Sequence, residues 1–312
     1  MKTIPLFILV SISSLLHSQS SPNILWLVCE DQSMSFSLYG DNHADTPHLN
    51  RLSEDGTVYE NCFTPSPVCS PSRSSIITGM YPTSIGTQHM RNYKKIKKHD
   101  INPHNQLPFY SPIPYKNIHF FTETLRAHGY YCSNNSKEDY NMLTSPLAWD
   151  DSSPKAHWCN RDSDQPFFSV FNFSITHESK VWENNVSYSK EELDLITLPV
   201  IFPQDDRIKT DFLTNYKNIE KLDKKLGDII QQLKDDGLYE NTIIFFFSDH
   251  GGPFPRYKRS IYDTGIKCPL VIKWHNNETE KRNNQLISFI DFAPTVLDIL
   301  DIKSDHQMEG VS

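Results

Sequence analysis

The hydrophobic pattern of the chain alternates between short, continuously apolar runs and longer segments with helical periodicity. Three apolar runs, at 23–29, 167–173 and 241–248, are typical of strands buried on both faces of a sheet. Shorter runs at 130–132 and 269–274 predict two further strands. The sequence therefore predicts a central sheet with at least one deeply buried layer.

The longest predicted helix covers 206–236, where apolar residues recur near the 3.6-residue period and Gly237 ends the pattern. Thr46-Pro47 can cap and start a helix that stops at Gly56, and Pro71 suits the first turn of a helix that ends near Gly79. Two more short helices are predicted over 120–128 and over 290–300. Strands that alternate with helices favour an α/β layer fold with a mostly parallel sheet. The segments 93–114 and 149–165 are rich in proline, asparagine and charge and are interpreted as loops.

The first twenty residues predict an export signal. Met1-Lys2 carries a positive charge, 4–16 is mainly apolar, and 17–20 offers small and polar residues for cleavage. This apolar run is too short to cross a bilayer, and no later segment is apolar for long enough. We therefore expect a signal peptide over 1–20, one domain over 21–312 and no membrane span. The expected location is secreted or periplasmic, or a lysosomal-type compartment in a eukaryote.

Charge and cysteine content narrow the possible partners. A formal net charge of −8 argues against nucleic acid but leaves room for an anionic substrate in a local basic pocket. Six cysteines in an exported chain could form disulfides, and the sequence leaves their pairing open. The chain stops at 307–312 without a closing element, which we interpret as a truncation.

Acidic residues follow two of the predicted buried strands. Glu30-Asp31 comes directly after 23–29, and Asp249-His250 comes directly after 241–248. Ligands of parallel sheets bind beyond the carboxyl ends of strands, and adjacent carboxylates repel each other unless a cation lies between them. Carboxylate ligands favour Ca²⁺ or Mg²⁺ over zinc. The pattern predicts a divalent cation site with His250 in or beside the shell, whereas a solvated turn is the alternative for Glu30-Asp31.

The segment Cys69-Ser-Pro-Ser-Arg73 places a cysteine at a predicted helix start, where free N–H groups favour an anion. The alternative is an ordinary proline-started helix with a buried thiol. Basic residues near other predicted strand ends suit an anionic substrate, although each alone is typical of a surface charge. They are Lys137, His177, Lys258 and Arg259. The lysine run at 94–98 is interpreted as a solvated loop.

Cys69-Ser-Pro-Ser-Arg73, followed by Ser74, Ser75, Thr78 and Gly79, resembles the signature of the formylglycine-dependent sulfatases. The paired acids and the segment 46–49 come before this motif, and the segments 248–251 and 262–270 come after it. This order is typical of that family. The resemblance runs from about Pro22 to the end of the chain. It implies an alkaline-phosphatase-like sandwich with a mostly parallel central sheet flanked by helices. It also implies that 21–312 is a sulfatase catalytic domain without the smaller C-terminal subdomain of the family.

The resemblance also implies a mechanism. Cys69 would be oxidised to formylglycine by a formylglycine-generating enzyme, and one hydroxyl of its hydrate would attack sulfur while the other later expels sulfate. The divalent cation, Ca²⁺ rather than Mg²⁺, would be held by Glu30, Asp31, modified Cys69, Asp249 and His250. In the same resemblance Arg73 stabilises the hydrate, Lys137 and Lys258 bind the sulfate, and His177 protonates the leaving group.

Two positions depart from the family pattern. Glu30 stands where many members have aspartate, and Glu138-Asp139 stands where many place a second histidine, for which His89 is an alternative source elsewhere in the chain. The stretches 86–91, 130–132 and 176–179 resemble those of heparan N-sulfatases and indicate a sulfated carbohydrate substrate. The alternatives are a phosphoester or phosphonate hydrolase on the same scaffold and a non-catalytic sugar-binding fragment.

Overall fold

The computed structural model describes residues 21–90, 111–113, 115, 117–182, 186–275, 280–304 and 306–312. The predicted signal peptide at 1–20 and the lysine run at 94–98 lie outside this part of the chain. Within the described ranges, no helix combines the length and the apolar character needed to cross a membrane.

An eight-stranded sheet forms the centre of the molecule, in the order β4-β3-β5-β1-β6-β7-β2-β8. The strands are β1 (Asn23–Cys29), β2 (Thr57–Phe63), β3 (Tyr131–Asn135), β4 (Asp151–Ser152), β5 (Phe167–Phe173), β6 (Thr242–Ser248), β7 (Lys267–Lys273) and β8 (Arg282–Ser288). Only β7 runs antiparallel to its neighbours β6 and β2. The prediction of a mostly parallel α/β sheet is confirmed.

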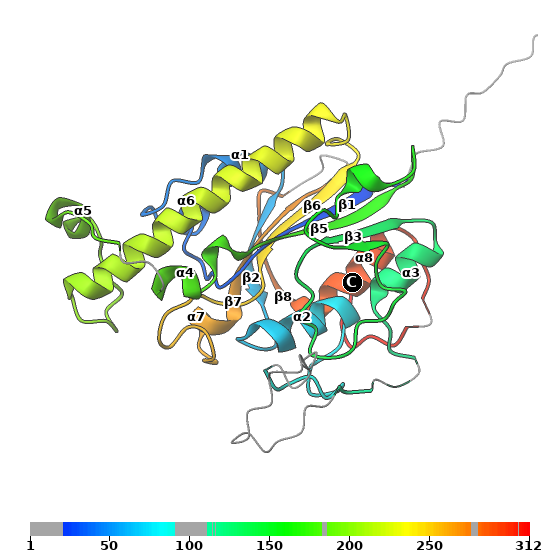
Figure 1. Ribbon diagram of the computed structural model, residues 1–312, viewed down its shortest axis with the longest axis horizontal. Coiled ribbons are helices and arrows are strands. Elements are labelled where there is room, and N and C mark those ends of the chain that lie inside the picture. The colour runs from blue at the N-terminus through cyan, green and yellow to red at the C-terminus, as the bar shows by residue number, and fades with distance from the viewer. Residues whose placement is uncertain are drawn as a thin grey trace, which may run out of the picture.

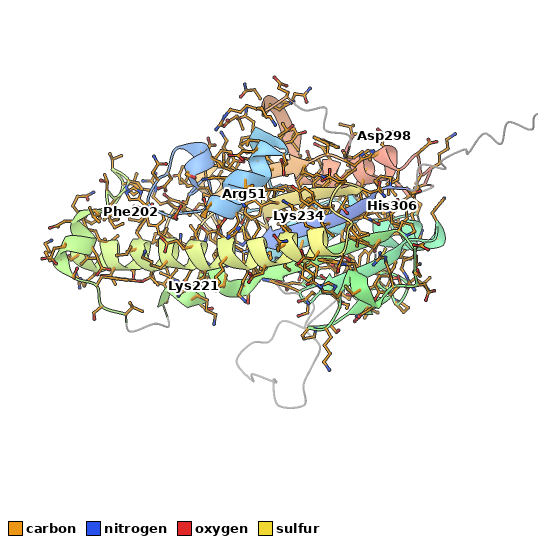
Figure 2. The ribbon with its side chains drawn as sticks, turned by 90° about the horizontal axis from the view of Figure 1, so that it is seen from above. Arg51, Phe202, Lys221, Lys234, Asp298 and His306 are labelled. Carbon is orange, nitrogen blue, oxygen red and sulfur yellow. The ribbon has the colours of Figure 1, made fainter. Side chains whose placement is uncertain are left out.

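Helices cover both faces of this sheet (Figure 1). One face packs against α6 (Asp206–Asp235) and α1 (Pro47–Glu54), and the other against α2 (Cys69–Thr78), α3 (Phe121–Ala127) and α8 (Phe292–Ile299). Figure 2 shows α6 extending along one side of the molecule, with Lys221 and Lys234 on it. The shorter helices are α4 (Ser179–Trp182), α5 (Lys190–Asp194) and α7 (Asp263–Ile266).

The central strands are apolar on both faces because two separate cores enclose them. In β1, Ile24, Trp26 and Val28 face the core of α2, α3 and α8, whereas Leu25 and Leu27 face the core of α1 and α6. Alternating side chains of one strand thus serve two helix layers, which explains the continuous apolar runs of the sequence.

The N-terminus of α1 is capped by a residue distant in sequence. The prediction that Thr46 caps this helix is wrong, since its side chain makes no capping hydrogen bond. Instead, Asp223 of α6 accepts hydrogen bonds from the backbone N–H groups of His48 at 3.0 Å and Leu49 at 2.8 Å. The carboxylate therefore satisfies two helix N–H groups and ties α1 to α6.

We predict that Asp223→Ala lowers the free energy of unfolding by about 1–3 kcal/mol, because two helix N–H groups lose a largely buried partner. Asp223→Asn is the matched control, since its amide oxygen still accepts one of these bonds and its loss is expected to be smaller. Urea denaturation of the two variants measures the difference. Equal stability of Asp223→Ala and the parent chain would show that the cap contributes nothing.

Three strands were not predicted: β2, β4 and β8. β8 pairs with β2 alone, its residues are largely exposed, and it carries mostly polar side chains, so no apolar run marks it. β2 is only partly buried and mixes polar with apolar residues. β4 lies within the predicted loop 149–165 and has only two residues. Edge strands are set by their partners rather than by their own hydrophobicity.

The cysteines and the last described residues complete the fold. All six cysteines are free thiols, and all but Cys159 are buried. Near the C-terminus, Glu309 accepts hydrogen bonds from the backbone N–H of Tyr81 and from Ser84 Oγ, so this segment packs beside the end of α2.

Candidate active site

The site forms where β1, β5 and β6 end in register. Cys29 pairs with Phe173 on one side and with Ser248 on the other, so the residues that follow each strand meet at one edge of the sheet. These residues are Glu30 and Asp31 after β1, the 3-10 helix Ser174–Thr176 and His177 after β5, and Asp249 and His250 after β6. The predicted convergence of the acidic residues at strand ends is therefore observed.

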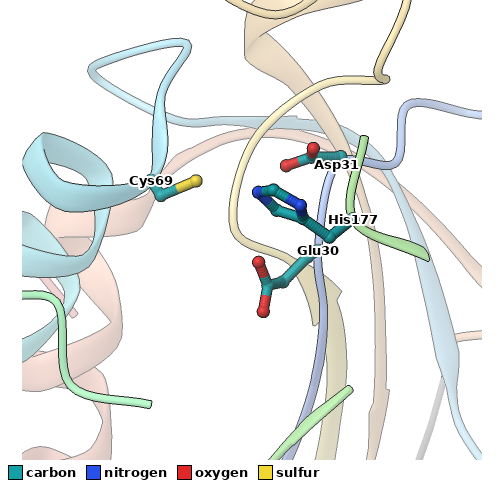
Figure 3. Close-up of side chains that lie close together, drawn as sticks. All are labelled: Glu30, Asp31, Cys69 and His177. Carbon is teal, nitrogen blue, oxygen red and sulfur yellow. The ribbon is translucent and has the colours of Figure 1, made fainter. Parts of the chain in front are cut away.

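Cys69 is the first residue of α2 and faces this edge (Figure 3). The extended Val68 precedes it, and Pro71 fits the first turn, where a backbone N–H would have no partner in the helix. The Cys69 Sγ lies 3.2 Å from His250 Nε2. The thiol is therefore directed into a polar site rather than into the apolar interior. This position argues against the alternative of an ordinary helix with an inert buried thiol.

The acidic side chains form a set suited to a hard cation. Glu30, Asp31 and Asp249 are at most 2% exposed. Ligand atoms of Glu30, Asp31, Cys69 and His177 lie within 4.8 Å of one another, as do those of Cys69, Asp249 and His250. Three buried carboxylates that meet around one point fit a divalent cation with oxygen ligands. The residues present thus suit the predicted ion.

Each of these carboxylates is paired with a cationic side chain. Lys137 Nζ lies 2.5 Å from Glu30 Oε2, and Lys258 Nζ lies 2.8 Å from Asp31 Oδ2. His250 Nε2 lies 3.0 Å from Asp31 Oδ1. Two lysines predicted to bind an anion therefore reach the acidic cluster itself, where they can serve both the carboxylates and a neighbouring anion.

The charges shift several pKa values. Burial by itself raises the pKa of Asp31, but His250 and Lys258 outweigh it and hold that pKa well below its usual range. Burial lowers the pKa of His250, whereas the carboxylates of Asp249 and Asp31 raise it. The net result is a pKa well above the ordinary value of histidine. Burial and Asp249 raise the pKa of the Cys69 thiol, while His250 and His177 lower it, and the net shift is downward. Without a bound cation, the side chains therefore favour an ionised carboxylate beside a cationic imidazole.

Arg73 lies one turn into α2, behind Cys69. Its Nε is 3.0 Å from Asp249 Oδ2, and its Nη1 donates to Asn172 Oδ1 at 2.6 Å. The preceding Ser72 donates its hydroxyl to the backbone carbonyl of Asp249 at 2.5 Å. These bonds fix the start of α2 against the end of β6, and they orient Asp249 toward the site.

Two residues that contact the candidate site were not predicted from the sequence. Asn172 is the only amide in the otherwise apolar end of β5, and that isolated polar residue was an available signal. Glu178 follows His177, accepts from Lys258 at 3.1 Å and from Arg259 at 2.7 Å, and its backbone N–H donates to Asp31 Oδ2 at 2.7 Å. Its role depends on contacts between distant segments, which no local pattern reveals.

Four more residues named in the sequence analysis remain to be placed: His177, Asp139, His89 and Arg259. His177 lies in the ligand group with Cys69, and its Nδ1 is 3.0 Å from Ser179 Oγ. Asp139, at the position where many family members place a histidine, accepts a hydrogen bond from Ser70 Oγ at 2.7 Å. His89 is exposed, and its backbone carbonyl accepts a hydrogen bond from Asn141. Arg259 is also exposed and pairs with Glu178 at the rim.

Comparisons with known proteins agree with this geometry. A family model described as Sulfatase matches residues 22–302. An ulvan-active sulfatase of Formosa agariphila is 43% identical over 325 residues, which cover 93% of this chain and 54% of the relative. N-sulphoglucosamine sulphohydrolase of Homo sapiens is 24% identical over 314 residues, which cover 90% of this chain and 61% of the relative. The chain spans roughly half to two-thirds of the length of the curated relatives it matches.

Solved structures share the fold at low sequence identity. A 2-O GAG sulfatase superposes with a TM-score of 0.71 at 16% identity, covering 94% of this chain and 73% of that one. A phosphonate monoester hydrolase of Agrobacterium radiobacter superposes with a TM-score of 0.67 at 16% identity, covering 93% and 76%. The predicted alkaline-phosphatase-like sandwich is confirmed by these neighbours.

Proposed function

Because the chain belongs to the sulfatase family, we propose that it hydrolyses sulfate esters or sulfamates on a sulfated carbohydrate, with a nucleophile made by oxidation of Cys69. One observation carries the proposal. The Cys69 Sγ lies at a helix N-terminus and faces Glu30, Asp31 and Asp249, which are buried beside Lys137 and Lys258. A nucleophile, a cation site and two ammonium groups are thus within reach of one small anion.

The proposed cation is Ca²⁺, held by Glu30, Asp31, Asp249, His250 and the modified Cys69. Mg²⁺ fits less well, because it demands a stricter octahedral geometry and retains more of its water. When bound, the ion supplies positive charge that draws electron density from the sulfate oxygens and favours the ionised hydrate. Its charge would offset the mutual repulsion of the carboxylates, and Lys137 and Lys258 would then be available to the substrate.

The proposed reaction has two steps. Formylglycine at position 69 is hydrated to a gem-diol, and one hydroxyl attacks sulfur while the bond from sulfur to the sugar oxygen or nitrogen breaks. The second hydroxyl then loses its proton, the carbon–oxygen bond to sulfate breaks and the aldehyde re-forms. A single hydroxyl could complete only the first step. The covalent route thereby divides one difficult displacement into two easier ones.

The side chains around Cys69 support this sequence by charge and position. Lys137 and Lys258 neutralise the sulfate oxygens, Arg73 holds Asp249 and stabilises the diol, and the helix N-terminus of α2 adds positive potential. His177 donates a proton to the leaving oxygen or nitrogen. While residue 69 is still a thiol, the contact with Cys69 is the largest cause that raises the pKa of His177 above the ordinary value.

The same proposal includes export and maturation. The N-terminal signal peptide over 1–20 would direct the chain out of the cytoplasm, with 21–312 forming the catalytic domain. A formylglycine-generating enzyme would modify Cys69 before or during export. The acidic overall charge of −8 leaves the basic site as a local feature, which suits an anionic sugar polymer.

Paired substrates test the reaction class. The chain, produced together with a formylglycine-generating enzyme, is expected to hydrolyse 4-nitrophenyl sulfate at least about 10-fold more efficiently than 4-nitrophenyl phosphate. Steady-state values of kcat/KM measure the ratio. A preference for the phosphate or for a phosphonate ester would establish the alternative hydrolase instead, and no turnover of any ester by fully modified protein would establish a non-catalytic binding role.

A further inference from the structure

The segment 252–262 folds so that one side chain enters the site while its neighbours remain outside. The Lys258 side chain is 2% exposed and contacts Asp31, whereas Arg256 and Arg259 are exposed. Both arginines have left-handed backbone conformations, with φ of 67° and 68°. Such non-glycine conformations cost of order 1 kcal/mol each and persist only when the surrounding structure holds them. The loop therefore places Lys258 in the site and leaves the side chains of Arg256 and Arg259 exposed.

Arg256 is held by an aromatic ring and not by an acid. Its guanidinium carbon lies 4.9 Å from the ring centroid of Tyr262, and that tyrosine is 55% exposed. Among the described residues, no carboxylate lies within ion-pair distance of Arg256. Arg259 differs, since both of its terminal nitrogens pair with Glu178. Arg256 thus presents an oriented cation whose hydrogen-bonding groups remain available to a ligand.

A second exposed ring lies beside this segment. Trp182 of α4 is 47% exposed and makes an edge contact of 6.2 Å with Phe254. Glu178, just before α4, bridges Lys258 and Arg259, so α4 is anchored to the same loop. The loop is also tied to the Cys69 segment, because the backbone N–H of Arg259 donates to the carbonyl of Pro67 at 2.8 Å. Two half-exposed aromatic rings and an available guanidinium therefore lie on two segments, 252–262 and α4, that are tied to the site through Lys258 and Glu178.

We infer that Arg256, Tyr262 and Trp182 form a subsite for the sugar adjoining the sulfated one, and that Arg256 binds an anionic group on that sugar. The inference rests on the proposed function and names its substrate class as an acidic oligosaccharide. The rings cover the apolar C–H face of a pyranose, and the planar guanidinium donates two parallel hydrogen bonds to a carboxylate or a sulfate.

The test compares substrates with and without the second anion. The substrates are a sulfated disaccharide with a uronate neighbour, the same disaccharide with its carboxyl reduced to an alcohol, a disaccharide with a second sulfate, and 4-nitrophenyl sulfate. We expect Arg256→Gln to lower kcat/KM for the uronate or the doubly sulfated substrate by about 10-fold or more, through KM. Hydrolysis of the reduced disaccharide and of 4-nitrophenyl sulfate should stay within about twofold.

Two matched variants separate recognition from folding. Arg256→Lys keeps the charge without the planar fork and should show an intermediate loss, whereas Arg51→Gln removes an exposed arginine of α1 and should change nothing (Figure 2). The substrate that responds identifies the anion as carboxylate or sulfate. An equal loss on all four substrates, or no loss on any, would overturn the inference. Calorimetry measures binding of the uronate disaccharide to the parent chain and to Arg256→Gln, independently of hydrolysis. If no substrate is hydrolysed, the proposed function is contradicted. If the disaccharide binds equally to both proteins, the subsite is contradicted.

Discussion

Cys69→Ala is expected to lower kcat for sulfate hydrolysis by at least about 10,000-fold, because it removes the thiol that the proposed oxidation to formylglycine requires. No other described side chain at the start of α2 offers a comparable group to the acidic edge, since Ser70 donates to Asp139 and Ser72 donates to the Asp249 carbonyl. The fold should be little affected, because the thiol is small and contacts a polar site instead of the apolar core. Thermal unfolding of the variant checks that point.

Cys69→Ser distinguishes a two-hydroxyl mechanism from simple nucleophilic attack. Its single hydroxyl can displace the sugar once, but no second hydroxyl remains to expel the sulfate. We expect loss of steady-state turnover together with a stable adduct about 80 Da heavier than the variant, detected by intact-mass spectrometry after incubation with substrate. Repeated turnover by Cys69→Ser would contradict the requirement for a diol.

Asp31→Ala is expected to lower kcat/KM by about 1,000-fold or more and the affinity for Ca²⁺ by at least about 100-fold. Asp31 is fully buried, lies at the centre of the carboxylate set and contacts both Lys258 and His250. Its removal therefore takes one carboxylate partner from each of two cationic side chains, in addition to removing a proposed ligand. Chelation of the parent protein with EDTA should abolish activity, and added Ca²⁺ should restore it.

Controls separate metal binding from stability. Asp31→Asn keeps the shape and one acceptor oxygen, so it should fold more stably than Asp31→Ala while still binding Ca²⁺ weakly. Asp228→Ala removes an exposed carboxylate on α6 and should bind Ca²⁺ as the parent does. Calorimetric titration of EDTA-treated protein measures all three. Unchanged Ca²⁺ affinity in Asp31→Ala would show that the ion, if bound, lies elsewhere.

The buried strands and the acidic residues that follow them could be predicted because each depends on local pattern. Continuous apolar runs marked β1, β5 and β6, and parallel pairing then placed Glu30, Asp31 and Asp249 at one edge. The start of α2 was also predictable, since Pro71 and Gly79 mark the limits of that helix. These elements contain most of the candidate site.

What could not be predicted depends on contacts between distant segments. β8 carries no apolar run because only its partner β2 holds it, and Asp223 caps α1 from a helix that is remote in sequence. Likewise, Lys137 and Lys258 gave no local sign that they would pair with Glu30 and Asp31. Such pairings are properties of the assembled fold.

Peptide mass mapping of the active protein tests the central claim most directly. The peptide that ends at Arg73 should be about 18 Da lighter than its thiol form when Cys69 has become formylglycine, and the fraction converted should match the fraction of active sites. Protein that hydrolyses sulfate at its full rate while carrying only the unmodified Cys69 thiol would contradict the account.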